Sequence, residues 1–290
     1  MAPEFHLFLP QMRMPLDTLV ERANAAEAAG FGGIWGMDHL APPLADDQPM
    51  YEAMTLNTFL SARTERLTIG SLVLCDALRH PTVLAREAVT IDHVSGGRFE
   101  LGIGSGSVPG ELVTFGVEPQ GTGDRVTRLG ETLDVLRALW SGEQVDYEGR
   151  FMRLRAAQQL PVPLDRIPIL IGGTGPRMMK LVAKHADWWN VPIHQLDRIE
   201  KMREHAGDAR VSVQERVVFV PSEVEREQIV ETAARRFGSM GVVPGSASEL
   251  VDHYGARVEL GVERFYVWFS DFAAPATLEA FGAGVISAFG

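Results

Sequence analysis

The sequence predicts a (β/α)8 TIM barrel, in which eight parallel strands form a closed ring and the connecting helices surround it. Two observations lead to this fold class. Short apolar runs alternate with amphipathic runs along the whole chain, which is typical of strand–helix units around a parallel sheet. The length of 290 residues also suits one barrel, so we predict a single domain over residues 1–290. A doubly wound sheet would accept the first four units, but the count of eight favours the barrel.

The first half of the chain contains four predicted strands, each followed by a helix. The strands are expected at residues 4–9, 33–38, 67–74 and 99–104. Their helices are expected at residues 16–30, 51–63, 82–94 and 128–140, where apolar residues recur at helical spacing. Residues 67–74, LTIGSLVL, are nearly all apolar, so we expect this strand to be buried on both faces.

An insertion is expected after the fourth unit, before the pattern resumes. Residues 144–154 alternate like a small hairpin, and the proline-rich residues 161–168 follow. The remaining strands are expected at residues 169–171, 188–191, 211–220 and 264–269. Helices are expected at residues 176–185, 197–205, 222–237, 247–260 and 275–289.

Charge and composition narrow the class of function. The chain has 38 acidic and 27 basic residues and a net charge of −11, which disfavours nucleic acid and anionic membranes as partners. It has no apolar run approaching 18 residues and no signal-peptide pattern at its start, so we expect a cytoplasmic protein. The single cysteine, Cys75, excludes an internal disulfide, and no histidine spacing suggests a metal site.

Two glycine-rich stretches follow buried strands and are expected to approach a ligand closely. The first is FELGIGSG, which ends in Gly104, Ser105 and Gly106. The second is ILIGGTGP, where Gly175 and Pro176 open an amphipathic helix. Because a helix N-terminus has unpaired N–H groups that bind anions, this second stretch predicts a phosphate site.

Asp38 and His39 are the best catalytic candidates. They stand at the carboxyl end of the second predicted strand, where the active sites of such barrels lie. A carboxylate beside an imidazole can supply general acid–base chemistry near neutral pH. The alternative is that Asp38 is an ordinary turn residue and His39 is solvated.

Three other residues have a structural interpretation beside a functional one. Cys75 is expected to be a small buried residue in preference to a nucleophile. Arg125 and Arg128 lie at the start of the fourth helix and could reach a phosphate, although surface positions are commoner for arginine.

The chain resembles the bacterial luciferase-like monooxygenase superfamily, a group of flavin- or deazaflavin-dependent barrels. The resemblance runs almost end to end and rests on many short motifs at matching separations. These motifs are AAGF at residues 28–31, DHL at 38–40, TERL at 64–67, RHP at 79–81, DH at 92–93, SGGR at 95–98, GIGSG at 102–106, Glu111, FG at 115–116, EG at 148–149 and GGTGP at 172–176.

The resemblance implies where a cofactor would bind. The ring would lie in the barrel mouth beside Ser71, Leu72 and Val73, and a cis peptide bond of the family matches Ser71–Leu72. The cofactor phosphate would lie at the second glycine-rich loop with help from the first. The residues so implied are Gly172, Gly173, Thr174 and Gly175, together with Gly104, Ser105 and Gly106.

The Asp38–His39 pair resembles the branch that uses coenzyme F-420, so the resemblance implies hydride transfer between F-420 and a small organic substrate. Some dehydrogenases of that branch have a Trp shortly after the pair and a Glu beside the first glycine loop, where this chain has Pro42-Pro43 and Ser107-Val108. The alternatives are an FMN-dependent monooxygenase served by a separate reductase, and a non-catalytic cofactor-binding relative. Relatives are commonly homodimers, and we expect the same here.

Overall fold

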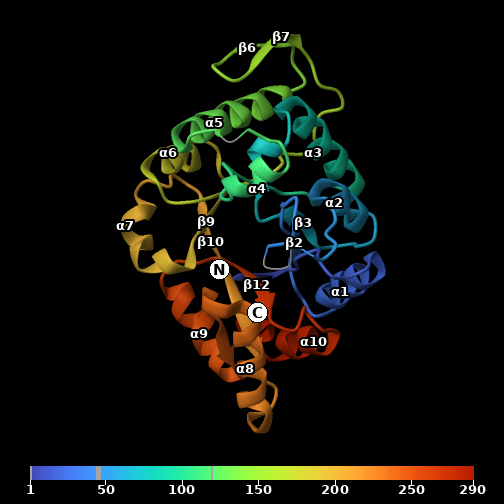
Figure 1. The fold of residues 1–290 in the computed structure, drawn as a ribbon, viewed down its shortest axis with the longest axis vertical. Coiled ribbons are helices and arrows are strands. Elements are labelled where there is room, and N and C mark those ends of the chain that lie inside the picture. Colours follow the sequence, from blue (N-terminus) through green and yellow to red (C-terminus); the bar gives the residue numbers. More distant parts are fainter. Residues whose placement is uncertain (1, 44–46, 119) are drawn as a thin grey trace.

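The computed structural model describes residues 2–43, 47–118 and 120–290, and shows a barrel of parallel strands surrounded by helices (Figure 1). Neighbouring strands follow the order β3-β2-β1-β12-β10-β9-β8-β5-β4, and every pair among them is parallel. A parallel bridge from Ile69 in β3 to Phe99, just before β5, closes the ring. The predicted TIM-barrel fold class is therefore confirmed.

The strands of the barrel occupy nearly the positions that the apolar runs predict. They are β1 (Glu4–Phe8), β2 (Gly33–Gly36), β3 (Thr68–Ser71), β4 (Leu74–Cys75), β5 (Leu101–Gly104), β8 (Ile169–Gly172), β9 (Trp188–Val191), β10 (Arg210–Phe219) and β12 (Arg264–Phe269). A short strand that the sequence did not indicate, β11 (Val243–Gly245), pairs with β10. The hairpin of β6 (Val145–Glu148) and β7 (Arg153–Ala157) projects beyond α5, at the top of Figure 1.

The helices cover the outer face of the barrel. They are α1 (Leu16–Ala28), α2 (Ala53–Ser61), α3 (Pro81–Ser95), α5 (Thr122–Leu139), α6 (Pro176–His185), α7 (Ile199–Arg203), α8 (Arg226–Phe237), α9 (Ala247–Glu259) and α10 (Pro275–Gly284). A further short helix, α4 (Pro109–Thr114), follows β5 at the barrel mouth and was not predicted. Its six residues are too few for an apolar period to be visible.

The third strand differs from its prediction. Residues 67–74 form two strands, because the chain leaves the ladder with β2 after Ser71 and then pairs with β5 as β4. The cis peptide bond joins Leu72 to Val73, so its predicted position at Ser71–Leu72 is wrong by one residue. The reason is the register: Ser71 pairs with Gly36, and the Leu72 N–H still donates to the Gly36 carbonyl at 2.8 Å. The ladder with β2 therefore ends at Ser71, and Leu72 donates its last backbone hydrogen bond just before the cis bond.

Charged and aromatic side chains fill the barrel at the amino ends of its strands. Arg264 is 4% exposed and donates to Glu100 at 2.5 Å and to Glu4 at 2.7 Å. Its guanidinium carbon lies 3.7 Å from the centre of the Trp188 ring. Beside it, fully buried His6 accepts a hydrogen bond at 3.0 Å from the Trp35 indole. We call this group the barrel floor; it leaves the carboxyl ends of the strands as the open end.

Candidate functional site

A cavity of about 330 Å³ lies at the carboxyl ends of β2, β4, β5 and β8. Sequence reasoning placed a site at these strand ends, and many of the predicted residues line this one cavity. They are Asp38, His39, Leu72, Val73, Gly104, Ser105, Gly106, Gly172 and Gly173. Ser71, Thr174 and Gly175 do not line it. The Ser71 hydroxyl accepts from the Asn57 amide at 3.0 Å instead, among buried residues between α2 and β3.

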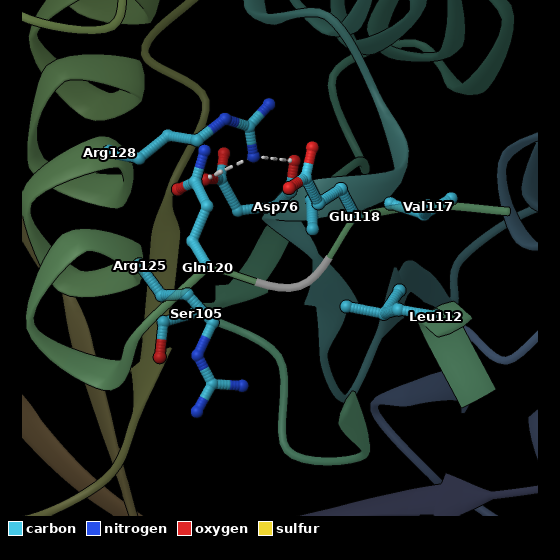
Figure 2. A pocket seen from close by; sticks show the side chains of 9 residues that line it. Asp76, Ser105, Leu112, Val117, Glu118, Gln120, Arg125 and Arg128 are labelled. Atoms are coloured by element: carbon cyan, nitrogen blue, oxygen red, sulfur yellow. Dashed lines mark hydrogen bonds and ion pairs between the residues drawn. The ribbon is translucent and has the colours of Figure 1, made fainter. Parts of the chain in front are cut away.

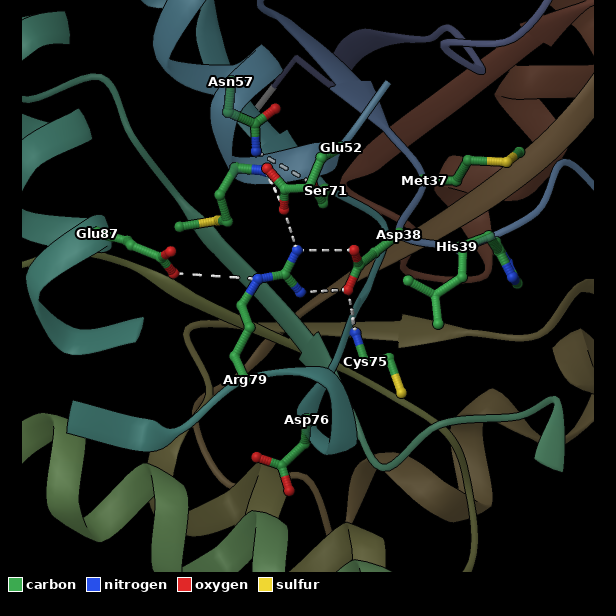
Figure 3. A network of polar contacts seen from close by, with 12 residues as sticks. Met37, Asp38, His39, Glu52, Asn57, Ser71, Cys75, Asp76, Arg79 and Glu87 are labelled. Atoms are coloured by element: carbon green, nitrogen blue, oxygen red, sulfur yellow. Dashed lines mark hydrogen bonds and ion pairs between the residues drawn. The ribbon is translucent and has the colours of Figure 1, made fainter. Parts of the chain in front are cut away.

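Asp38 is held from two sides, as Figure 3 shows. Arg79 donates two hydrogen bonds to its carboxylate, at 2.6 and 2.9 Å, and the Cys75 N–H donates a third at 2.8 Å. Both carboxylate oxygens are therefore occupied, and the Asp38 side chain is only 4% exposed. Such a carboxylate is fixed in place and ties β2 to the segment after β4.

Arg79 is shared among several carboxylates (Figure 3). Besides Asp38 it contacts Glu52, and its Nε lies 4.0 Å from Glu87. Burial disfavours the charge of Arg79, but the bonds to Asp38 and Glu52 outweigh it and raise the pKa of Arg79 above its usual value. Burial raises the pKa of Glu52, but the hydrogen bonds from the Thr55 N–H and from Arg79 outweigh it and lower this pKa to about 2. The arginine thus stays charged and compensates the buried Asp38.

His39 is paired with a residue that the sequence did not assign to the site. Its Nδ1 lies 2.8 Å from Glu111 Oε2, and Glu111 belongs to α4. The other oxygen of Glu111 accepts from the backbone N–H groups of Leu40 and Ala41, the latter at 3.2 Å. One side chain thus fastens α4 to the loop after β2. Because a carboxylate only accepts, this contact makes Nδ1 the protonated nitrogen of a neutral His39, with Nε2 left as an acceptor.

Apart from its polar residues, the cavity is lined by apolar side chains and by glycines. Leu72 and Val73 supply the apolar side, and a Cβ on Gly104 would lie 2.9 Å from Val73. Gly106 has a φ of 81°, and a Cβ there would lie 2.9 Å from the Cys75 sulfur. By contrast, a Cβ on Gly172 would meet nothing within 4 Å. The absence of side chains at these glycines therefore keeps the cavity open.

Cys75 is not suited to act as a nucleophile. Burial raises the pKa of its thiol, which disfavours the reactive thiolate.

The second glycine loop leads directly into α6. Gly173 has a φ of 115°, and the Trp189 indole donates to its carbonyl at 2.8 Å. Gly175 is the N-cap and supplies no capping side chain, and Pro176 begins the helix. The first N–H groups of α6 consequently have no side-chain cap, next to the cavity wall formed by Gly172 and Gly173. This is the usual arrangement for binding an anion at a helix N-terminus.

A smaller cavity of about 140 Å³ adjoins the first and shares Ser105 and Leu112 with it (Figure 2). Arg128 donates at 2.8 Å to the carboxylate of Asp76, whose pKa burial raises despite the arginine. Arg125 donates to the Gly106 carbonyl at 2.8 Å. The prediction that these arginines lie at the surface is wrong for Arg128. Its side chain is only 14% exposed and forms an ion pair with Asp76 beside the site.

Sequence reasoning missed Arg79 and Glu111 as parts of the site. Both occur in motifs on which the family resemblance rests, and that was the one signal that could have found them. Each is distant from its partner in the sequence. Arg79 follows Asp38 by 41 residues, and Glu111 follows His39 by 72 residues. In the described ranges no three His, Cys, Asp or Glu side chains are arranged to hold a metal ion. Nor is any described helix long and apolar enough to cross a membrane.

Comparison with known proteins gives both sequence and fold relatives. The family described as luciferase-like monooxygenase matches residues 3–264. An F-420-dependent glucose-6-phosphate dehydrogenase of Microbacterium testaceum is 36% identical over 172 residues, which is 59% of this chain and 51% of that protein. The chain thus spans about half the length of the curated relatives it matches.

Two solved structures share the whole fold. An F-420-dependent secondary alcohol dehydrogenase, in complex with an F-420–acetone adduct, has a TM-score of 0.84 at 19% identity and covers 98% of both chains. The EDTA monooxygenase of Chelativorans sp. BNC1 has a TM-score of 0.86 at 13% identity, covering 100% of this chain and 94% of its own. At these identities the two structures establish the fold.

Proposed function

Since the chain belongs to the luciferase-like monooxygenase family, we propose that it is an oxidoreductase that transfers a hydride between coenzyme F-420 and a small organic substrate. One observation carries the proposal. The cavity at the barrel mouth joins the His39–Glu111 pair to an apolar wall and to a glycine loop at a helix N-terminus. The F-420-dependent dehydrogenases among the relatives support this choice of cofactor.

The residues present fit a flat ring that carries a phosphate. Leu72 and Val73 offer an apolar surface for the ring, and the open side of Gly172 leaves room for it. The phosphate would be held by the N–H groups of the loop from Gly172 to Gly175 and of the first turn of α6. Gly104, Ser105 and Gly106, at the end of the neighbouring strand β5, would help to hold it. When bound, the deazaflavin supplies a ring carbon that gives or takes the hydride.

The protein's own contribution is to position the substrate and to move a proton. His39 holds its Nδ1 proton toward Glu111, so its Nε2 can accept a proton from a substrate oxygen or return one. Asp38 would act as a positioning residue, because Arg79 and the Cys75 N–H occupy both of its oxygens.

The deciding experiment is a binding titration of F-420 and FMN side by side. We expect F-420 to bind with micromolar or better affinity and FMN to be rejected. Gly172→Ala should fold normally but bind F-420 about 10-fold or more weakly, because its methyl group would fill the cavity wall. Gly255→Ala on α9, also without a contact within 4 Å, is the matched control and should bind normally.

Two results would overturn this assignment. Tight FMN binding with consumption of oxygen would favour a monooxygenase that works with a separate reductase. Cofactor binding without detectable turnover, unchanged in Asp38→Ala and His39→Ala, would leave a non-catalytic cofactor-binding protein. The homodimer stays a prediction, and analytical ultracentrifugation of the purified protein tests it.

A further inference from the structure

A third cavity, also about 330 Å³, lies across the barrel mouth from the first. It is formed at the carboxyl ends of β1 and β12 and by the end of α8, whereas the first cavity is lined by residues of α4 and of the ends of β2, β4, β5 and β8. The function proposed above assigns no role to it. Its volume is in the range of small-molecule sites.

The charge of this cavity is opposite to that of the protein. Arg13, Arg235 and Arg236 line it, and no carboxylate is among its described lining residues. One of the three, Arg235, is paired with Glu231 at 3.6 Å, so Arg13 and Arg236 supply the local positive charge that attracts anions despite the net charge of −11. Asp271 lies nearby, but its oxygens accept from the Ala273 N–H and the Thr277 hydroxyl.

Aromatic rings form much of the remaining wall, and one of them holds Arg236 in place. The Arg236 guanidinium lies 5.1 Å from the centre of the Phe272 ring and donates to the Ser270 carbonyl. Phe237 packs edge-on against Trp268, with their ring centres 5.1 Å apart. The cavity thus combines cationic groups with a rigid apolar surface, which suits a ligand with one charged end and one apolar end.

The backbone of this cavity has conformations that are rare for residues with a Cβ. Arg13 has a φ of 64° and Phe272 a φ of 60°, both in the left-handed region. Arg13 is held there by its N–H bond to the Pro49 carbonyl at 3.1 Å and by the bridge between Met12 and Met50. Such strained positions cluster at ligand-binding sites, where they direct a side chain.

We propose that this cavity binds the anionic end of the substrate, and that the substrate is an apolar carboxylate. The carboxylate would lie between Arg13 and Arg236, and the apolar body would lie on Trp268 and Phe272. This inference rests on the proposed function, because it places the reacting carbon toward His39. Trp268, Leu72 and Val73 all pack against one buried apolar cluster inside the barrel, so the apolar body of the substrate would extend from Trp268 toward the first cavity.

The test measures binding to the cofactor-free protein and needs no turnover. The probes are 3-phenylpropionate, its neutral isostere 3-phenylpropionamide and inorganic phosphate, titrated by calorimetry. We expect the carboxylate to bind about 10-fold or more tightly than the amide, since a hydrogen bond to a charged group is worth about that factor. Arg13→Gln and Arg236→Gln should each abolish this preference. The matched control is Arg155→Gln, on exposed β7, and should leave it unchanged.

The outcomes separate this proposal from the proposed function. Equal binding of carboxylate and amide, or a preference that survives both arginine substitutions, would overturn the anion subsite even if F-420 binds. Inorganic phosphate bound as tightly as the phenyl carboxylate would overturn the apolar part of the assignment. A carboxylate preference that depends on Arg13 and Arg236 in a protein that does not bind F-420 would retain the anion subsite and refute the proposed function. Thermal melting of each variant confirms that it is folded.

Discussion

Replacing Glu111 by Gln should reverse the tautomer of His39. In the native protein Glu111 Oε2 accepts from His39 Nδ1 at 2.8 Å, and the other oxygen accepts from Leu40 and Ala41. Glutamine has one oxygen and one NH₂ group, so it cannot satisfy all three donors. If the NH₂ faces His39, Nδ1 must become the acceptor and Nε2 takes the proton.

The structure decides which way the glutamine turns. Turning its oxygen toward His39 would leave two backbone N–H groups, those of Leu40 and Ala41, facing another donor, at about 1–3 kcal/mol each. Turning its NH₂ group toward His39 only moves one proton between the two ring nitrogens. The second arrangement is favoured by about 2 kcal/mol or more, which is at least a factor of about 30 in population.

Nitrogen-15 NMR of the histidine ring measures this directly. We expect the native protein to show a protonated Nδ1 at His39, and Glu111→Gln to show a protonated Nε2. Glu143→Gln, at an exposed position, is the control and should keep the native tautomer. An unchanged His39 tautomer in Glu111→Gln would refute this reasoning, and a protonated Nε2 in the native protein would refute the acceptor role of Nε2.

Three further predictions concern stability and are measured by chemical denaturation. Gly102→Ala should destabilise the fold by about 3 kcal/mol or more, because its Cβ would lie 2.0 Å from the Ser71 carbonyl oxygen; a loss below 1 kcal/mol would contradict this. Arg79→Gln should cost about 3 kcal/mol by leaving the buried Asp38 carboxylate without its cation, and Asp38→Asn in the same chain should recover part of the loss. Burial, with Arg264 nearby, lowers the pKa of His6 from 6.5 to about 3. Between these two values the unfolded chain binds a proton at His6 that the folded protein does not bind. Stability is therefore full above pH 6.5 and should fall by about 2 kcal/mol by pH 5, whereas His6→Gln should show a smaller fall.

The alternation of apolar and amphipathic runs was sufficient to predict the barrel and most of its strands. The prediction succeeds because each strand is buried on both faces and each helix on one face. This burial gives strands and helices different spacings of apolar residues in the sequence. The break after Ser71 does not change this spacing, because residues 67–74 are apolar on both sides of it. Only the pairing of β4 with β5 reveals it.

The candidate site was predictable where it depends on strand ends and glycines. Asp38, His39 and Gly172 come directly from the order of the strands, because the carboxyl ends of parallel strands meet at one face. The partners Arg79 and Glu111 depend on tertiary contacts between distant segments, and α4 is too short to show a helical period. Local patterns therefore identify which groups face the cavity and miss the groups that hold them.

The barrel floor also limits how ligands can move. Arg264, Glu100 and Trp188 fill the interior at the amino ends of the strands, so a ligand that enters at the mouth must leave through the same opening. A ring lying against Leu72 and Val73 would be deeper than any molecule lying over it. With a single opening, the order of arrival fixes the order of departure: the deeper ligand binds first and leaves last. Steady-state kinetics would then show a compulsory order, set by the position of one buried arginine at the far end of the barrel.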